Sequence, residues 1–210
     1  MFKEFVRAIL AGEAISLGGI AYICCQNKII GSIFFAVGLF LVLIANLNLL
    51  TGKFCYICQN NDCRKCAKLI LTTFIGNLIG CVVCGLACRL SNYIDFIQTF
   101  QIALESKINR PWQETIILAA FCNVCIFIAV KGYSKQKENW KKILSLFFGV
   151  SIFVLCGFEH CIADLFYITI CSAWNLKSCV FIALVIIGNL IGGTLCSCIE
   201  NFLTEKSKIE

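Results

Sequence analysis

Charged residues are scarce in this sequence, and their scarcity excludes an ordinary soluble domain. Asp, Glu, Lys and Arg make up 14% of the 210 residues, whereas 60% are hydrophobic. A soluble globular domain carries about 25% charged residues. The mean hydropathy of +0.87 and several long apolar runs instead indicate membrane-spanning helices. The chain is long enough for about six spans and leaves little for a separate soluble domain.

Neither a cleavable signal peptide nor a network of disulfides is expected. The N-terminal apolar stretch continues to Ile23 and contains Glu13, so it is too long and too polar for the core of a signal peptide. The 17 cysteines lie mostly inside apolar runs. Buried free cysteine behaves as a small hydrophobic residue, which favours reduced packing thiols in a reducing cell.

Hydropathy predicts an all-α membrane protein with six transmembrane helices, of which the second and fifth are broken. The second segment is interrupted near Asn46, Asn48 and Gly52, and the fifth is interrupted around 157–164. The six predicted segments are Val6–Cys25, Ile29–Ile57, Leu69–Leu90, Trp112–Gly132, Ile143–Thr169 and Cys179–Phe202.

Lysine and arginine predict the orientation. If both termini and the loops after the second and fourth spans face the cytoplasm, 13 of the 18 Lys and Arg residues lie inside and five lie outside. The positive-inside rule therefore predicts a multi-pass protein of the plasma (inner) membrane with both termini in the cytoplasm. The net charge of +6 is explained by this topology and requires no nucleic-acid partner.

A repeated pentapeptide predicts two oppositely oriented halves. Gly-Asn-Leu-Ile-Gly occurs at 76–80 and again at 188–192, an offset of 112 residues. With three spans per half, residues 5–92 and 112–203 form inverted repeats of one membrane domain that covers residues 1–210. The same offset aligns Asn48 with His160. A break at mid-membrane must be buried in protein or line a watery cavity, and half-helix N-termini at such breaks favour anions.

The break of the fifth span carries three ionisable side chains, Glu159, His160 and Asp164, and His160 is the single histidine of the chain. Ionisable groups at such depth are costly, so they usually face a pore or a partner. The alternative is a hydrogen-bonded histidine that only ties the broken helix together. Glu159 is interpreted as structural, because a carboxylate beside a helix break can accept unpaired backbone N–H groups.

These residues resemble the formate/nitrite transporter family, and the resemblance covers nearly the whole chain. Gly157–Phe166 (GFEHCIADLF) is similar to the fifth-span signature of that family. Lys107, sixteen residues before Asn123, matches the entrance lysine of the family. Further similar segments are Ala11–Gly12, Leu17–Gly19, Leu49–Gly52, Asn123–Cys125 and Gly188–Gly193.

The resemblance implies a homopentamer of aquaporin-like protomers, each with its own pore and with His160 between two apolar constrictions. It implies that Thr51 supplies a hydroxyl near the histidine and that Lys107 draws anions into the vestibule. Other implied pore residues are Leu49 and Leu50 for one constriction, Phe153 and Ile126 for the other, and the amides of Asn123 and Asn189.

The chain also departs from the family pattern. Asp164 replaces the usual asparagine and Asn48 replaces the usual acid of the second-span loop, so the two changes amount to a charge exchange between the halves. Leu50 replaces the usual phenylalanine. We interpret Glu159, Asp164 and Asn48 as supports of the broken helices.

The implied function is transport of small monovalent anions rather than catalysis, with no cofactor. Formate is the first choice, followed by nitrite and hydrosulfide. An anion that enters a low-dielectric centre gains proton affinity, so it can take a proton from His160 or from a Thr51-linked water and cross as the neutral acid. In the competing version the anion stays charged and His160 only donates a hydrogen bond.

Two Cys-x-x-Cys pairs leave other functions open. Four thiolates can bind zinc or an iron–sulfur cluster, although the four-residue gap between the pairs is short for a zinc ribbon. The alternative function from another class is a membrane thiol oxidoreductase that uses these pairs. A neutral-solute channel of the aquaporin type is disfavoured, because the paired Asn-Pro-Ala motifs are absent. The four cysteines are Cys55, Cys58, Cys63 and Cys66.

Overall fold

The computed structural model describes residues 2–57, 62–91 and 94–206, and within these ranges the chain forms nine α-helices and no strand. The helices are α1 (Phe2–Cys24), α2 (Lys28–Ile44), α3 (Leu50–Phe54), α4 (Cys63–Leu90), α5 (Ile94–Ile108), α6 (Trp112–Lys135), α7 (Asn139–Leu155), α8 (Cys161–Ile170) and α9 (Leu176–Lys206). Residues 1, 92 and 207–210, which belong to the predicted domain and repeat boundaries, lie outside the described ranges.

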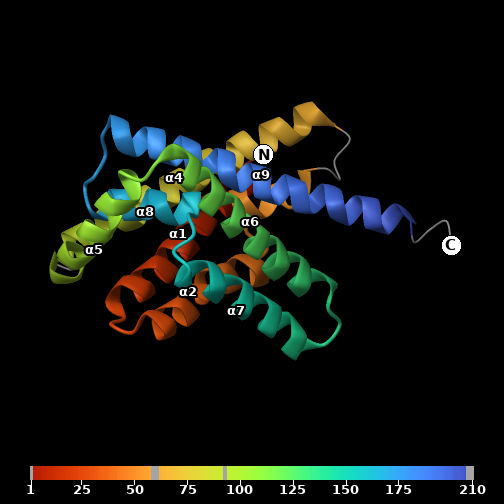
Figure 1. Ribbon diagram of the computed structural model, residues 1–210, viewed down its shortest axis with the longest axis horizontal. Coiled ribbons are helices and arrows are strands. Elements are labelled where there is room, and N and C mark those ends of the chain that lie inside the picture. The colour runs from red at the N-terminus through yellow and green to blue at the C-terminus, as the bar shows by residue number, and fades with distance from the viewer. Residues whose placement is uncertain (1, 58–61, 92–93, 207–210) are drawn as a thin grey trace.

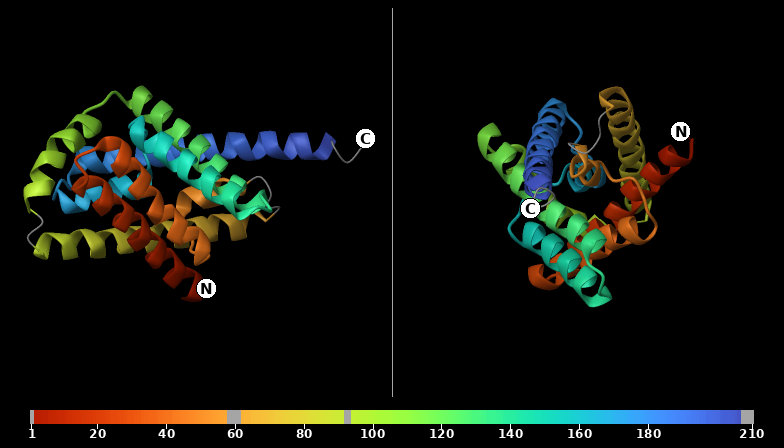
Figure 2. Two further views of the ribbon diagram at one scale, coloured as in Figure 1. Left: turned by 90° about the horizontal axis from the view of Figure 1, so that it is seen from below. Right: turned by 90° about the vertical axis from the view of Figure 1, so that its right-hand side faces the viewer.

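The helices form two similar groups joined by α5. In the first group α1 packs against α2 and α4, and in the second α6 packs against α7 and α9. The groups meet where α2 packs against α7, α8 against α4, and α3 against α9. Seen end-on, the longer helices surround the short α3 and α8 (Figure 2, right), and α9 continues past the bundle toward the C-terminus (Figure 1). Every residue of α8 is buried.

Within the described ranges, four helices are long and apolar enough to cross a membrane, namely α1, α4, α6 and α9, whereas α2 and α8 are shorter apolar helices. The four correspond to the first, third, fourth and sixth predicted segments. The second predicted segment is divided between α2 and α3, and the fifth is divided between α7 and α8. Helix α5 was not predicted, because its mixed polar and apolar residues fall below the hydropathy of a span.

Side-chain caps fix several helix starts. The Oδ1 atom of Asn27 accepts hydrogen bonds from the backbone N–H groups of Ile29 (2.9 Å) and Ile30 (3.1 Å) and begins α2. The Oδ1 atom of Asp62 accepts from the Lys65 N–H (3.0 Å) at the start of α4. This backbone hydrogen bond lowers the pKa of Asp62. Such caps satisfy N–H groups that have no partner inside the helix.

Both interruptions turn through one residue with left-handed backbone conformation. Asn46 has φ of 51° between α2 and α3, and Gly157 has φ of 68° between α7 and α8. Glycine adopts this conformation without steric cost and asparagine is among the few other residues that tolerate it. The two positions are equivalent in the two halves, so each break uses a residue type suited to it.

A buried asparagine closes each break with the same three hydrogen bonds. In the first half, Asn77 accepts from the N–H of Leu50 (2.9 Å) and donates to the carbonyls of Asn48 (2.8 Å) and Ala8 (2.7 Å). In the second half, Asn189 accepts from the N–H of Cys161 (3.0 Å). Its amide nitrogen donates to the carbonyls of Glu159 (2.9 Å) and Ala119 (2.8 Å). Two of the three bonds of each amide satisfy backbone groups that the break leaves without a helical partner, and the third attaches the amide to the neighbouring long helix, α1 or α6.

These hydrogen bonds correct the alignment of the two breaks by one residue. They equate Asn48 with Glu159, whereas the constant offset of 112 aligns Asn48 with His160. Within α4 and α9 the two halves keep the offset of the pentapeptide. At the break the offset is one residue smaller, because Asn77 binds a carbonyl 29 residues earlier in the chain whereas Asn189 binds one 30 residues earlier. By this alignment Leu49 matches His160, and both are the residues that precede their short helix.

Close helix packing explains the glycines of the repeated pentapeptide. A Cβ on Gly80 would clash with the carbonyl oxygen of Ile9, and a Cβ on Gly192 would clash with the carbonyl oxygen of Ala120. The missing side chains let α4 approach α1 and α9 approach α6 closely enough for the asparagines to reach the breaks.

We expect Asn77→Ala and Asn189→Ala each to destabilise the protein by about 3 kcal/mol or more, because each leaves one buried N–H group and one buried carbonyl at a break unpaired. The measurement is the thermal unfolding midpoint in detergent, followed by size-exclusion chromatography. Gln113→Ala, at an exposed position in the first turn of α6, is the matched control. Midpoints equal to that control would contradict the assigned role of the two amides.

Candidate functional site

The two short helices meet through one side-chain contact at the centre of the bundle. The Oγ1 atom of Thr51, in the first turn of α3, lies 3.0 Å from Nε2 of His160. Thr51 is fully buried and His160 is 2% exposed. His160 immediately precedes α8, and its Nδ1 accepts a hydrogen bond from the Ala163 N–H (3.2 Å). The contact joins residues that are 109 positions apart in the sequence.

The hydrogen bonds assign the tautomer of His160. Because Nδ1 accepts a hydrogen bond, it carries no proton, so the proton of the neutral ring is on Nε2 and is donated to the Thr51 oxygen. The Thr51 hydroxyl proton then remains to donate elsewhere. A doubly protonated ring would turn Nδ1 into a donor that faces the Ala163 N–H, and α8 would lose its cap.

Two cavities lie at successive positions along α2. The first, here called the α3 cavity, has a volume of about 330 Å³ and is lined by Leu39, Val42, Leu49 and Lys53 among others. The second, the α8 cavity, has a volume of about 90 Å³. Its lining includes Phe35, Phe153, His160, Asp164 and Tyr167. Leu49 lines the α3 cavity and His160 lines the α8 cavity, whereas Thr51 lines neither and contacts His160.

Aromatic rings narrow the α8 cavity beside His160. The rings of Phe35 and Phe153 pack edge to face with centroids 5.7 Å apart. The Phe153 ring also stacks on the His160 ring at 5.7 Å. Helix α5 contributes Phe100, whose ring lies 4.5 Å from that of Tyr167. Apolar side chains therefore flank His160 on the α8 side, and Leu49 lies on the α3 side.

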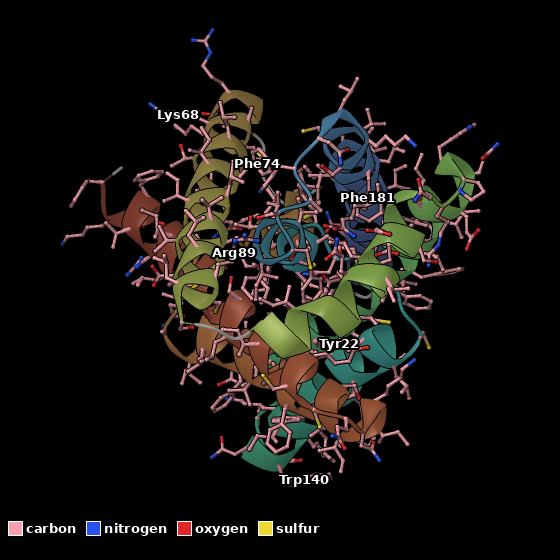
Figure 3. The ribbon with its side chains drawn as sticks, turned by 90° about the vertical axis from the view of Figure 1, so that its left-hand side faces the viewer. Tyr22, Lys68, Phe74, Arg89, Trp140 and Phe181 are labelled. Carbon is pink, nitrogen blue, oxygen red and sulfur yellow. The ribbon has the colours of Figure 1, made fainter. Side chains whose placement is uncertain are left out.

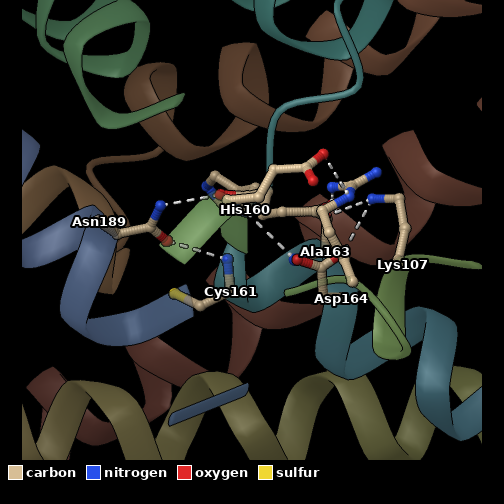
Figure 4. Close-up of polar contacts among 9 residues, drawn as sticks. Lys107, His160, Cys161, Ala163, Asp164 and Asn189 are labelled. Carbon is tan, nitrogen blue, oxygen red and sulfur yellow. Dashed lines mark hydrogen bonds and ion pairs between the residues drawn. The ribbon is translucent and has the colours of Figure 1, made fainter. Parts of the chain in front are cut away.

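A buried cluster of charges lies next to the second break. Lys107, near the end of α5, has its Nζ 2.6 Å from Oε2 of Glu159 and 3.3 Å from Oδ1 of Asp164. Arg110 also pairs with Glu159 and extends to Glu114 at 3.2 Å. The two carboxylates are at most 1% exposed. Figure 4 shows Lys107 on one side of the break and Asn189 on the other.

This cluster assigns Lys107 a different immediate role from the expected one. Its ammonium group is engaged by two carboxylates rather than free in a vestibule. Buried carboxylates require such compensation, since removal of one partner leaves an uncompensated charge in a low-dielectric site. Lys107 and Arg110 together balance Glu159 and Asp164, so the cluster adds no net positive charge to the α8 cavity.

The remaining predicted residues are distributed between cavity walls and framework. Leu50 (1% exposed) and Ile126 (1% exposed) are buried, but neither is among the residues that line the two cavities. The amide nitrogen of Asn123 lies 3.4 Å from the Thr51 carbonyl oxygen, to which it donates. Asn189 is occupied by backbone groups, which favours a structural role over the pore-lining role that the resemblance implies.

Asn48 ties the first break to the N-terminus. Its amide nitrogen donates to the carboxylate Oε2 (2.5 Å) and the carbonyl oxygen (3.1 Å) of Glu4. The Asn48 N–H donates to the carbonyl of Arg7 at 3.3 Å. These hydrogen bonds connect the residue before the first short helix to α1, which is compatible with the predicted supporting role of Asn48.

The cysteine hypothesis stays a prediction. Cys58 lies outside the described residues, and the side chain of Cys63 is likewise not described. Cys55 is fully buried, and its thiol donates to the Thr51 carbonyl (3.5 Å). Among the described residues, no group of three or more His, Cys, Asp and Glu side chains is placed to hold a metal ion.

Sequence reasoning missed several contributors to this site. Phe35 resembles any other apolar residue of α2, and Arg110 lies in a segment with no motif. The repeated pentapeptide already singled out Asn77, but its role depends on the backbone groups that it reaches. Arg89 points from α4 toward α8 (Figure 3) and donates to the Ile170 carbonyl at 3.2 Å.

The family model described as formate/nitrite transporter matches residues 1–202. The chain belongs to the formate/nitrite transporter family. It is 26% identical over 189 residues to the formate channel FocA of Escherichia coli strain K12, a match that covers 79% of this chain and 65% of the relative. The formate channel FocA of Haemophilus influenzae is 24% identical over 186 residues, with 80% and 66% covered.

The chain thus spans just under two thirds of the length of these two FocA relatives. A formate-nitrite transporter of Plasmodium falciparum is 25% identical over 226 residues and covers 90% of this chain and 73% of the relative. These relatives are named as channels and transporters, not as enzymes.

Two solved structures share the fold of this family member. A structure described as a pentameric formate channel with formate bound has a TM-score of 0.81 at 20% identity and covers 97% of both chains. An FNT family ion channel has a TM-score of 0.85 at 19% identity and covers 97% of this chain and 90% of the other. The resemblance inferred from the sequence motifs is therefore confirmed.

Lys107→Met should destabilise the protein by about 3–5 kcal/mol, because Glu159 and Asp164 lose a buried counter-charge. Adding Asp164→Asn to Lys107→Met should recover part of this loss, since one carboxylate is then neutral. Unfolding midpoints in detergent test both variants, with Lys177→Met at an exposed position as control. The absence of any recovery in the double variant would contradict the pairing.

Proposed function

We propose that this chain is a six-span channel for small monovalent anions, with formate as the first substrate and nitrite and hydrosulfide next. In this proposal α2 with α3 forms the broken second span, and α7 with α8 forms the broken fifth span. Family membership and the names of the relatives support transport of such anions. The observation that carries the proposal is the Thr51–His160 contact between two cavities (3.0 Å).

The two halves are proposed as inverted repeats of one membrane domain in the plasma (inner) membrane, with both termini in the cytoplasm. The equal hydrogen-bond patterns of Asn77 and Asn189 support the repeat. The distribution of lysine and arginine supports the orientation. A homopentamer is proposed because a structural relative is described as a pentameric formate channel.

The centre of the path offers hydrogen-bond donation without a net charge. With the Nε2 proton of His160 donated to Thr51, the Thr51 hydroxyl proton is available to a passing anion. A neutral donor compensates part of the hydration that the anion loses but does not hold it as tightly as a full positive charge. Conduction requires this balance, since binding must be weak enough for release.

Apolar side chains on both sides of the donor limit what passes. Leu49 borders the α3 cavity, and Phe35 with Phe153 borders the α8 cavity. Such constrictions exclude bulk water and raise the cost of ions that receive no hydrogen bonds. Small anions that Thr51 can reach are favoured over larger or divalent ones.

The geometry favours His160 as a fixed donor over His160 as a proton relay. Uptake of a second proton at Nδ1 would require release of the Ala163 N–H and would uncap α8. Proton co-transfer remains compatible with this arrangement if the proton reaches the anion from water rather than from the imidazole.

Flux into proteoliposomes tests the function. Formate, nitrite, hydrosulfide and lactate are compared side by side, with glycerol swelling as the neutral-solute control. We expect fast flux of the small anions, slower lactate flux and no glycerol swelling. Glycerol swelling without anion flux would overturn the proposal in favour of a neutral-solute channel, and absence of both would remove the channel function.

Replacement of His160 tests its role. His160→Asn should lower formate flux by about tenfold or more, because the donor and the α8 cap are both altered. The shape of the pH dependence should stay that of the wild type, since the imidazole does not relay the proton. Initial rates between pH 5 and 8 provide the measurement. A pH profile that flattens in His160→Asn would establish the relay instead.

A further inference from the structure

The two breaks carry opposite charges at equivalent positions. The hydrogen bonds of Asn77 and Asn189 equate Leu50 with Cys161. Counting three residues further along each short helix pairs Lys53 with Asp164. One half thus presents an ammonium group at the position where the other half presents a carboxylate.

The carboxylate is paired directly with a lysine, whereas the ammonium group has no direct ion-pair partner among the described residues. Asp164 pairs with Lys107 at 3.3 Å. Among the residues that the structure describes, Lys53 forms no ion pair or side-chain hydrogen bond, although it is half-buried and lines the α3 cavity. Glu4 interacts with Lys53 electrostatically but is already paired with Arg7 at 3.1 Å. An ammonium group that is partly removed from water and has no direct ion-pair partner attracts anions.

The other charges around the α3 cavity leave this excess in place. Glu4 and Arg7 line the same cavity and pair with each other at 3.1 Å. Lys131 lies over the ring of Tyr56 (3.9 Å), which also lines the cavity, but its Nζ is 2.7 Å from Glu200. Among the residues that the structure describes, two cations and one carboxylate line the α3 cavity, which gives this lining one net positive charge.

We propose that the α3 cavity contains a binding site for one small monovalent anion, held by the Lys53 ammonium group, and that the α8 cavity has no equivalent site. The volume of about 330 Å³ admits a partly hydrated monocarboxylate or inorganic anion. The single net positive charge of the cavity lining balances a monovalent anion but only half of the charge of a divalent anion. The role of this site in transport rests on the proposed function. If the site lies on the path, an anion that enters through the α3 cavity binds more tightly than one that enters through the α8 cavity.

The first test is independent of transport and uses bromide as the probe. Crystals of the full chain grown in sodium bromide should show an anomalous peak within about 4 Å of the Lys53 Nζ, the range of a direct ion pair. The peak should disappear in Lys53→Gln and persist in Lys53→Arg. No peak in the wild type, or an equal peak in Lys53→Gln, would overturn the proposal whether or not the protein transports anions.

The second test measures the half-saturating formate concentration in vesicles with one orientation of the protein. For entry from the α3 face, Lys53→Gln should raise this concentration by about fivefold or more, which corresponds to about 1 kcal/mol of lost attraction. Lys53→Arg should stay within about twofold of the wild type, because it keeps the charge. Entry from the α8 face should reach half-saturation at an unchanged concentration.

Lys65→Gln is the matched control, since the Lys65 side chain is 85% exposed and pairs only with Asp62 among the described residues. Equal shifts from both faces, or an equal shift in Lys65→Gln, would contradict a local site at Lys53. Absence of formate flux in the wild type would remove the proposed function, while the bromide experiment would still decide the binding site.

Discussion

The structure depends on one requirement, which is that the backbone groups at each helix break find partners away from water. Asn77 and Asn189 meet it with one accepted and one donated hydrogen bond each at the break. A second donated bond attaches each amide to the neighbouring long helix. In the proposed membrane setting, unpaired groups at these positions would cost several kcal/mol. Each amide replaces part of a missing helical ladder, so each short helix can begin in the interior of the bundle rather than at its surface.

The position of the proposed path follows from these two closures. Each asparagine fixes the first N–H of its short helix, at Leu50 and at Cys161. The next residue along α3 is Thr51, and the residue before Cys161 is His160. The two side chains therefore meet at 3.0 Å. The same closures place Lys53 and Asp164 at equivalent points of the two short helices. Lys107 of α5 pairs with Asp164 and with the adjacent Glu159, and Lys53 has no such direct partner among the described residues. The two cavities consequently differ in charge although their backbones are similar.

Local sequence signals predict the interruptions, and the structure divides the same two segments between α2 and α3 and between α7 and α8. The roles of His160 and Thr51 in a path stay predictions. Long apolar runs made the interruptions near Asn46 and Gly157 visible, and the family motif singled out His160 and Thr51. The sequence did not predict the partners of Lys107, because they depend on where the end of α5 lies over the second break. The constant offset between the repeats aligned Asn48 with His160 rather than with Glu159. The chain from the break to the asparagine of the last helix is one residue longer in the second half, and a constant offset cannot account for this difference.

Framework and path residues were harder to separate. Asn189 and Asn123 are both buried amides on long helices, and only the hydrogen bonds show that the first is fully engaged by backbone groups. Asn123 instead touches the Thr51 carbonyl. Leu49 and Leu50 are adjacent leucines, yet Leu49 lines the α3 cavity whereas Leu50 gives its N–H to Asn77. Whether such a residue lines a cavity or binds the backbone depends on the local backbone conformation at each break. Composition and residue spacing do not specify that conformation.

A cryo-electron microscopy structure of the full chain in a lipid nanodisc tests the central claim most directly. The account predicts that density places the amides of Asn77 and Asn189 on the backbone at the two breaks, with Thr51 and His160 in contact inside the protein. A continuous helix through either break, or an imidazole that faces lipid, would contradict it.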